Sequence, residues 1–145
     1  MRELYVTGTM HNRMRMIAAS YLTKHLRTDW RVGRDWFGDC LIDWDPGANA
    51  MGWQWVAGCG PDASPYFRIF NPATQGEKFD KAQKYRNQFL WDENSAEQRA
   101  FFDAIPKSWG ITAATPYPEP VVSLADGRQA ALDAYAQMRG GKPEI

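Results

Sequence analysis

Two stretches of the sequence carry side chains whose types and spacing could bind a planar polar ligand together with phosphate groups. The first stretch holds Asn12, Arg13, Arg15 and Met16, and the second covers residues 43–55. An amide side chain near tryptophan offers hydrogen bonds to the edge of a heteroaromatic ring. Arginine binds phosphate through two parallel hydrogen bonds, and Arg13 and Arg68 are candidates for that contact. The combination suits a planar cofactor beside a cleft for nucleic acid.

A purely structural interpretation of the same residues is also open. An arginine inside a fold needs a carboxylate partner, so Arg15 and Asp43 could form an ordinary ion pair that ties helices together. The three tryptophans of this region could equally fill a hydrophobic core, and they are Trp30, Trp53 and Trp55. Residue types alone leave both interpretations standing.

Other chemistries find less support in the sequence. Asp43 and Asp45 could form a carboxylate pair for a cation, but a hard cation normally recruits more oxygen ligands. Cys40 and Cys59 form neither a CxxC pair nor a cluster with histidine, which argues against structural zinc. The glycines of residues 58–60 lack the strand and helix of a dinucleotide-binding motif. We therefore expect no metal site and no Rossmann-type site.

Composition limits the class of protein further. The chain has 145 residues with 17 basic and 17 acidic side chains, 2 Cys and 7 Trp, and its length fits one domain. Balanced charge excludes a protein that is basic overall, so a nucleic-acid surface must be a local patch. Two cysteines are too few for a disulfide framework, and no signal peptide or membrane span is recognisable. These features predict a cytoplasmic protein.

Helices must position the candidate residues, because strand signals are nearly absent apart from a weak one over residues 4–6. Apolar residues at helical spacing predict a helix over about residues 10–26, with Thr7 or Thr9 as its N-cap. A second helix is expected over residues 33–42. The sequence therefore predicts a mainly α fold.

A third helix is predicted over residues 46–57. Asp45 is a favourable N-cap, and the proline that follows it is favourable at the first helical position. On this helix Asn49 and Trp53 share a face, whereas Trp55 projects from the roughly opposite side. The two tryptophans are therefore expected in different environments.

The second half of the chain is expected to alternate short helices with loops. We predict a loop over 62–80, short helices over 81–90 and 93–105, an irregular proline-rich connection over 106–120, and a last helix over 124–138 ended by glycines.

Several segments, taken in order, resemble the C-terminal half of the flavin-binding domain of DNA photolyases and cryptochromes. They are TGTMHNRMRM (7–16), DWR (29–31), DWDPGAN (43–49), GWQW (52–55), YFRIFNP (66–72) and QGEKFD (75–80). Residues 117–122 and the last helix resemble the end of that domain. The resemblance implies that residues 1–140 are the C-terminal portion of such a domain, a helical bundle-like structure, and that residues 141–145 are a tail.

What the resemblance implies is FAD-dependent, light-driven repair of cyclobutane pyrimidine dimers in DNA, a carbon–carbon lyase reaction. The family takes up the dimer flipped out of the duplex, and electron transfer from reduced flavin opens it. The implied cofactor is FAD, and the implied partner is DNA that contains pyrimidine dimers. No membrane is involved.

The family's cofactor contacts fall on matching positions of this sequence. Asn12, Arg15, Asp43, Asp45 and Asn49 would contact FAD. Asn49 would face the flavin N5, and Arg15 would pair with Asp43.

Electron-transfer and substrate roles fall on other positions. Trp53 would be the electron donor next to the flavin and Trp30 the next one outward, so with Asn49 they are the catalytic candidates. Trp55 and Met16 would line the dimer pocket. Arg13 and Arg68 would bind the phosphates beside the lesion.

Two departures from the family pattern affect the expected function. Thr9 stands where many members have tryptophan, which leaves the lesion subclass open. The resemblance begins midway through the family's domain, so we expect no antenna chromophore site, weak or no FAD binding by the chain alone, and a missing N-terminal half or partner chain. The alternatives are a non-catalytic remnant that binds DNA or a partner, and a fragment of a cryptochrome-like blue-light photoreceptor.

Overall fold

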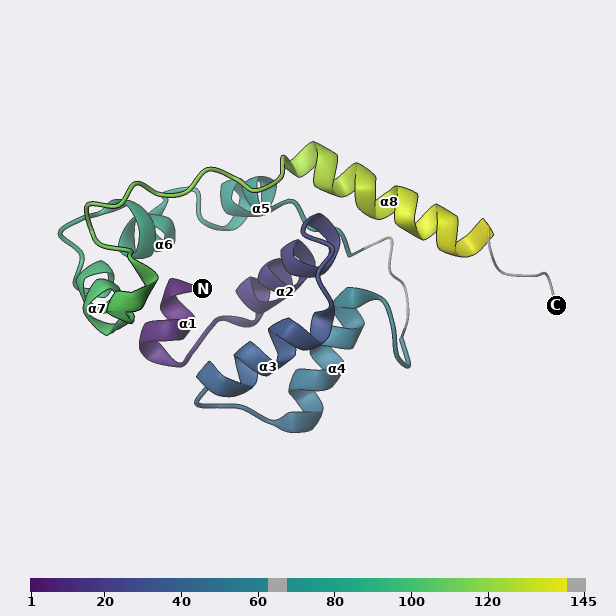
Figure 1. The fold of residues 1–145 in the computed structure, drawn as a ribbon, viewed down its shortest axis with the longest axis horizontal. Coiled ribbons are helices and arrows are strands. Elements are labelled where there is room, and N and C mark those ends of the chain that lie inside the picture. Colours follow the sequence, from purple (N-terminus) through teal and green to yellow (C-terminus); the bar gives the residue numbers. More distant parts are fainter. Residues whose placement is uncertain (63–67, 141–145) are drawn as a thin grey trace. The chain divides into compact units, whose positions relative to one another are not determined.

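A computed structural model describes residues 1–62 and 68–140. These residues form helices joined by loops and contain no strand, which confirms the predicted mainly α fold (Figure 1). The chain divides into two compact units. Unit 1 comprises residues 1–10, 40–43 and 72–119, and the described part of unit 2 comprises residues 11–39, 44–62, 68–71 and 120–140. The predicted tail, 141–145, lies outside the described residues.

Unit 2 carries the three helices predicted around the candidate residues. Helix α2 covers Asn12–Ser20 and continues into a π-helical turn, η1, over Tyr21–His25. Helix α3 covers Trp30–Cys40, and helix α4 covers Pro46–Ala57. The last helix, α8, covers Leu124–Gly140. All four predicted helices are therefore confirmed, with ends shifted by a few residues.

The N-caps of α2 and α4 differ in how well the sequence predicted them. Asp45 caps α4 as expected, since its Oδ1 accepts a hydrogen bond from the backbone N–H of Ala48 at 2.6 Å. The prediction of Thr7 or Thr9 as the cap of α2 is wrong. His11 takes that position, and its Nδ1 accepts from the N–H of Arg13 at 3.2 Å.

Helices α3 and α4 are joined by one close contact. The Trp53 ring of α4 lies against the α3 backbone at Gly33, where an added Cβ would be 2.1 Å from Cη2 of that ring. One turn later on α3, Phe37 meets the same ring edge-on, with ring centroids 4.8 Å apart. Trp53 is only 4% exposed, so the two aromatic residues form the centre of the α3–α4 packing.

The π-helical turn anchors two further elements of unit 2. Lys24 donates from Nζ to the carbonyl oxygen of Ala57 at the end of α4, where the helix dipole favours a cation. Burial of Lys24 lowers the pKa of its ammonium group. His25 is buried against Gly127 of α8 and stacks on Tyr21, with ring centroids 5.2 Å apart.

Unit 1 begins with helix α1 (Arg2–Thr7), so the weak strand expected over residues 4–6 is wrong. A strand needs a partner for its backbone groups, and the described residues offer no other strand. In the helix, the N–H of Gly8 bonds to the carbonyl of Leu4 at 2.9 Å, and Leu4 is fully buried. Gly8 has a φ of 68°, which ends the helix there.

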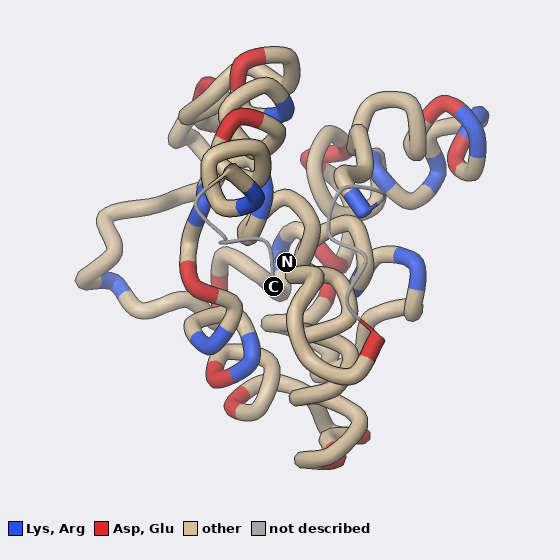
Figure 2. The backbone as a smooth tube through the Cα atoms, turned by 90° about the vertical axis from the view of Figure 1, so that its right-hand side faces the viewer, with Lys and Arg blue, Asp and Glu red and all other residues tan. Residues whose placement is uncertain are grey.

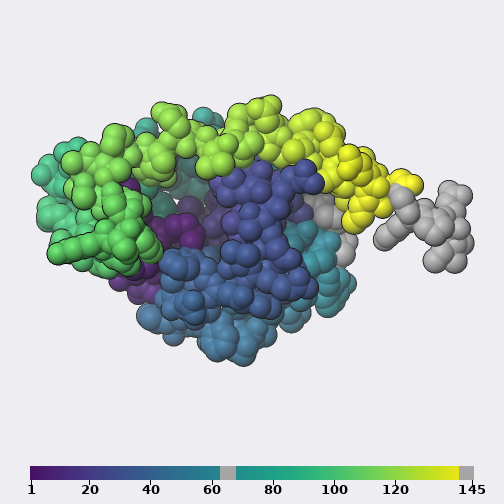
Figure 3. Space-filling model, in the orientation of Figure 1, coloured from purple at the N-terminus to yellow at the C-terminus, as the bar shows by residue number. Residues whose placement is uncertain are grey.

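The other elements of unit 1 are short. They are α5 (Pro72–Phe79), α6 (Lys84–Arg86), the π-helical turn η3 (Asn87–Trp91), α7 (Ala96–Ala104) and the 3₁₀ turn η4 (Lys107–Trp109). Helix α5 contradicts the loop predicted over 62–80, and it begins at proline, a residue suited to a first helical turn. Residues 106–119 are otherwise irregular, as predicted, and they are also exposed (green in Figure 3).

An arginine at the start of α1 gathers the aromatic residues of unit 1. The Arg2 guanidinium donates to the carbonyl oxygen of Phe89 at 3.0 Å. Its central carbon lies 4.9, 5.1 and 5.6 Å from the ring centroids of Phe101, Phe102 and Tyr117. Cation–π contacts of this kind favour a guanidinium that is partly removed from water.

None of the described helices is long and apolar enough to cross a membrane.

A Gly33→Ala substitution should destabilise the protein severely, by about 3 kcal/mol or more, because the new methyl group would overlap the Trp53 ring. Gly52→Ala is the matched control, since it is also helical and has no atom within 4 Å of its added Cβ. That change should stabilise α4 by about 0.5–1 kcal/mol. Urea unfolding measures both, and equal effects would contradict the packing described.

Acidification should destabilise unit 2 through His25. Burial lowers the pKa of its imidazole below the ordinary value of about 6.5, so the unfolded chain binds a proton at a higher pH than the folded chain. The free energy of unfolding should therefore fall as the pH drops below about 6.5, until the folded pKa is passed. His25→Gln should remove this dependence in urea unfolding between about pH 7.5 and pH 5. His11→Asn, which keeps a side-chain acceptor at the cap, should retain it.

Candidate functional site

Asn49 links α4 to α3 through its side chain. Its Nδ2 donates to the backbone carbonyl oxygen of Arg34 at 2.9 Å, and the residue is half-buried. This bond uses the amide nitrogen, so the amide oxygen is the part of the side chain that can accept a hydrogen bond from a ligand. Trp53 lies one turn further along α4 on the same face, as the sequence predicted.

The tryptophans of α3 and α4 differ in their access to solvent. Trp53 Nε1 is enclosed and has no hydrogen-bond partner within residues 1–62 and 68–140. Trp30 is partly exposed, and the guanidinium carbons of Arg31 and Arg34 lie 5.3 and 5.4 Å from its ring centroid. Gly33, which supports the Trp53 ring, follows Trp30 by one turn of α3, so both tryptophans belong to one region of the α3 surface.

The first turns of α2 present polar groups and a methionine. Asn12 directs its Nδ2 toward the Met16 sulfur at 3.8 Å, so these two residues share a face one turn apart. Asn12 and Arg13 are exposed, whereas Arg15 and Met16 are half-buried. The structure therefore keeps these four sequence candidates together on one short helix.

Trp55 and Arg68 form a second centre, on a different side of α4. The central carbon of the Arg68 guanidinium lies 3.7 Å from the Trp55 ring centroid. Asp62, which sequence reasoning missed, accepts hydrogen bonds through Oδ2 from Trp55 Nε1 at 2.8 Å and from Arg68 Nη2 at 3.0 Å. No local pattern links Asp62 to a residue of α4 seven positions before it and to a residue six positions after it, so only the folded chain reveals this cluster.

Arg68 differs from the exposed phosphate-binding arginine that its sequence position suggests. It is 7% exposed, and its Nη1 donates to the carbonyl oxygens of Trp55 and Asp62. The guanidinium is thus used within the protein, and contact with a phosphate would have to share it. Of the two predicted phosphate-binding arginines, Arg13 is the exposed one.

The two carboxylates predicted near the cofactor lie in separate units. Asp45 belongs to unit 2 and uses one oxygen as the cap of α4, while Asp43 is an exposed residue of unit 1. The pairing of Arg15 with Asp43 stays a prediction. Within the described parts of the chain, no group of three or more His, Cys, Asp or Glu side chains could hold a metal ion.

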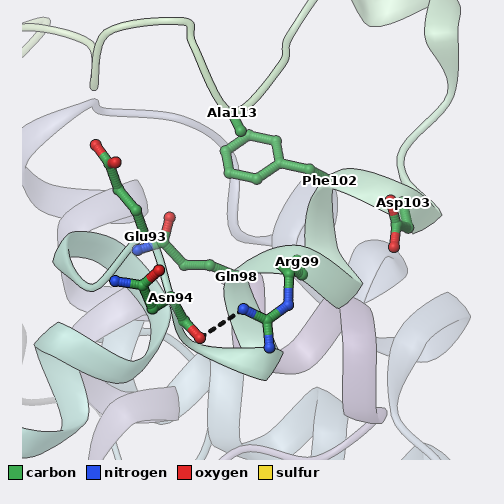
Figure 4. Close-up of a pocket in the computed structure, with 7 residues that line it drawn as sticks. All are labelled: Glu93, Asn94, Gln98, Arg99, Phe102, Asp103 and Ala113. Carbon is green, nitrogen blue, oxygen red and sulfur yellow. Dashed lines mark hydrogen bonds between the residues drawn. The ribbon is translucent and has the colours of Figure 1, made fainter.

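Unit 1 contains a cavity of about 360 Å³ that holds none of the candidate residues (Figure 4). Its lining consists of Glu93, Asn94, Gln98, Arg99, Phe102, Asp103 and Ala113. The Gln98 Nε2 atom is enclosed rather than open to this cavity, and Arg99 donates to the carbonyl oxygen of Asn94 at 2.6 Å.

Basic and acidic residues are interspersed along the backbone (Figure 2).

These helices and their polar faces match a known class of flavoprotein domain. Residues 1–137 match the family model of the FAD binding domain of DNA photolyase, and the chain belongs to this family. FAD is the cofactor that characterises the family.

Individual relatives give the same assignment. The chain is 49% identical over 146 residues to the deoxyribodipyrimidine photo-lyase of Agrobacterium fabrum. This alignment covers 96% of the chain and 30% of the relative. A bacterial class III photolyase from Agrobacterium tumefaciens superposes with a TM-score of 0.75 at 48% identity, covering 96% of this chain and 30% of that structure. The Synechocystis cryptochrome superposes with a TM-score of 0.72 at 34% identity, covering 92% and 29%. The chain thus spans about 30% of the length of the relatives it matches.

Proposed function

We propose that this chain supplies the electron-conducting and substrate-facing part of a FAD-dependent photolyase that repairs cyclobutane pyrimidine dimers. The observation that carries the proposal is the enclosed Trp53 ring of α4. It lies against α3 at Gly33, one turn from the partly exposed Trp30, and Asn49 is one turn back along α4. Membership of the photolyase family supports the same function. We propose that the protein acts in the cytoplasm, on damaged DNA.

The residues present fit a flavin. Asn49 retains an amide oxygen beyond its bond to Arg34, and Asp45 retains a second carboxylate oxygen beyond its cap. Such acceptors suit the N–H edge of a heteroaromatic ring, while an arginine such as Arg15 suits its carbonyl oxygens. We assign these residues, together with Asn12 and Asp43, to the binding of FAD.

The chemistry that bound FAD would supply is light-driven donation of an electron to the dimer and its recovery after the ring opens. Trp53 and Trp30 would conduct electrons between the surface of α3 and the cofactor. Trp30 is open to solvent in part, whereas Trp53 is enclosed by Gly33 and Phe37. This order of exposure supports Trp30 as the outer member and Trp53 as the inner one.

Substrate contact would fall to the other face of α4 and to α2. A pyrimidine base taken out of the helix loses its stacking partners, and an aromatic ring such as Trp55 replaces them. Met16 supplies an adaptable apolar contact. Arg13, exposed at the start of α2, would bind a phosphate beside the lesion, and Arg68 would contribute through Trp55.

A second candidate is a cryptochrome-like photoreceptor. The similarity to the Synechocystis cryptochrome favours it, because a photoreceptor would use the same tryptophans without repair. Repair of a thymine-dimer oligonucleotide under blue light, by a photolyase that contains this chain, separates the two. Light-driven flavin reduction without loss of dimers would favour the photoreceptor.

Asn49→Ala should weaken FAD binding about five- to tenfold, because one hydrogen bond to the ligand is lost. We expect the chain alone to bind FAD with a dissociation constant above about 1 µM, which flavin fluorescence titration can measure. Gln129→Ala, an exposed change on α8, should leave the affinity unchanged. Equal affinity of Asn49→Ala and the parent would overturn the assignment of Asn49, and tight stoichiometric binding would contradict the expected weakness.

Arg13→Ala should weaken binding of a single-stranded oligonucleotide that carries one thymine dimer. Loss of one phosphate contact should lower the slope of log affinity against log salt by about 0.7. The matched control is Arg128→Ala, which removes an exposed arginine from α8. If both variants keep the parent's slope, α2 does not contact the DNA backbone.

A further inference from the structure

A single carboxylate oxygen holds the Trp55 side chain and its neighbour in place. Asp62 Oδ2 accepts from Trp55 Nε1 at 2.8 Å and from Arg68 Nη2 at 3.0 Å. The Asp62 side chain is 69% exposed, whereas that of Arg68 is 8% exposed. The carboxylate therefore reaches from the surface to fix two side chains that lie further inside.

Arg68 covers one face of the Trp55 ring and is itself immobilised. Its Nη1 donates to the carbonyl oxygens of Trp55 and Asp62, so one guanidinium bonds to the backbone in the last turn of α4 and in the loop that follows it. Its own carbonyl oxygen accepts from the hydroxyl of Ser20 at 2.8 Å, and the same hydroxyl accepts from the N–H of Phe70 at 2.9 Å. Ser20 is fully buried in α2.

The Trp55 ring is consequently limited to one orientation. Its N–H edge is bonded to Asp62, and one of its faces is occupied by the guanidinium at 3.7 Å. Rotating the indole about its outer side-chain bond would break the hydrogen bond and expose the cation of Arg68. Trp55 is still partly exposed, so a stacking partner has only the remaining face to use.

We propose that Asp62 is a positioning residue of the substrate pocket, which fixes the Trp55 indole and the Arg68 guanidinium so that one face of the indole is ready to stack on a flipped-out pyrimidine. The reference to a pyrimidine rests on the proposed function. The fixing of Trp55 by Asp62 is independent of it and is measured separately below.

A ring that is fixed before binding loses less conformational entropy when a base stacks on it. A tryptophan that samples several orientations must lose that freedom when a base stacks on it, whereas a ring already fixed does not. The same arrangement explains why Arg68 is buried at a position where the sequence suggested a phosphate contact. Its charge is matched by Asp62 and lies against the ring, which leaves the phosphates to Arg13.

Two measurements on the full chain test the proposal. The first is the near-ultraviolet circular dichroism of Trp55, obtained as the difference between a protein and its Trp55→Phe counterpart. The second is the ratio of affinities for a single-stranded oligonucleotide with one thymine dimer and for the same oligonucleotide without it. Asp133→Ala, an exposed change on α8, is the control and should change neither quantity.

Asp62→Ala should abolish most of the Trp55 dichroism and reduce the preference for the dimer about tenfold, with unchanged far-ultraviolet dichroism. Asp62→Asn should largely restore both, because the amide oxygen still accepts from the indole N–H. If the alanine variant does not fold, Asp62→Glu, which displaces the carboxylate by one methylene group, should show the same two losses.

Three results would count against parts of the inference. Unchanged Trp55 dichroism in Asp62→Ala would show that Asp62 does not position the ring. A failure of Asp62→Asn to restore the Trp55 dichroism would show that the hydrogen bond to the indole N–H does not fix the ring, and it would overturn the proposal. If Trp55→Phe binds the dimer as the parent does, the proposed substrate role of Trp55 is wrong, and the dichroism alone still decides whether Asp62 fixes the ring.

Discussion

The close approach of the Trp53 ring to the α3 backbone at Gly33 is the constraint on which unit 2 depends. Only a residue without Cβ lets the indole lie there, and the contact sets both the distance and the rotation of α4 relative to α3. Once that rotation is set, Asn49 falls opposite the carbonyl of Arg34, one turn back along α4. The packing of α4 against α3 therefore also fixes the position of Asn49, the candidate cofactor residue of this face.

Helix α4 separates two kinds of aromatic environment by its periodicity alone. Trp53 and Trp55 differ by two positions, which places them on opposite sides of the helix. The inner side is built from packed rings, whereas the outer side is polar and built from Trp55, Arg68 and Asp62. The residue proposed to conduct electrons, Trp53, and the residue proposed to stack on the substrate, Trp55, thus occupy one short helix without sharing surroundings.

Much of this arrangement could be predicted from signals within a few residues of sequence, whereas contacts between residues far apart in the chain could not. Asp45 capping α4, and the opposed faces of that helix, follow from rules that act over a few residues. The strand expected over residues 4–6 failed because the described residues offer it no partner strand, and the caps expected at Thr7 or Thr9 failed because α2 begins later, with His11 as its cap. The burial of Arg68 depends on Ser20 and Asp62, which lie 48 and 6 positions away, and no spacing rule spans that distance.

The π-helical turn at Tyr21–His25 changes the direction in which the residues after α2 point. A π turn holds an extra residue, and each residue of an α-helix corresponds to a rotation of about 100°. The residues after α2 therefore point where a continuous α-helix would not send them, with Lys24 toward the end of α4 and His25 toward Gly127. Deleting one residue here would restore a regular helix while turning both anchors away. The length of this turn is thus fixed by the two anchors, whereas a change of side chain at the exposed start of α2 would leave both anchors in place.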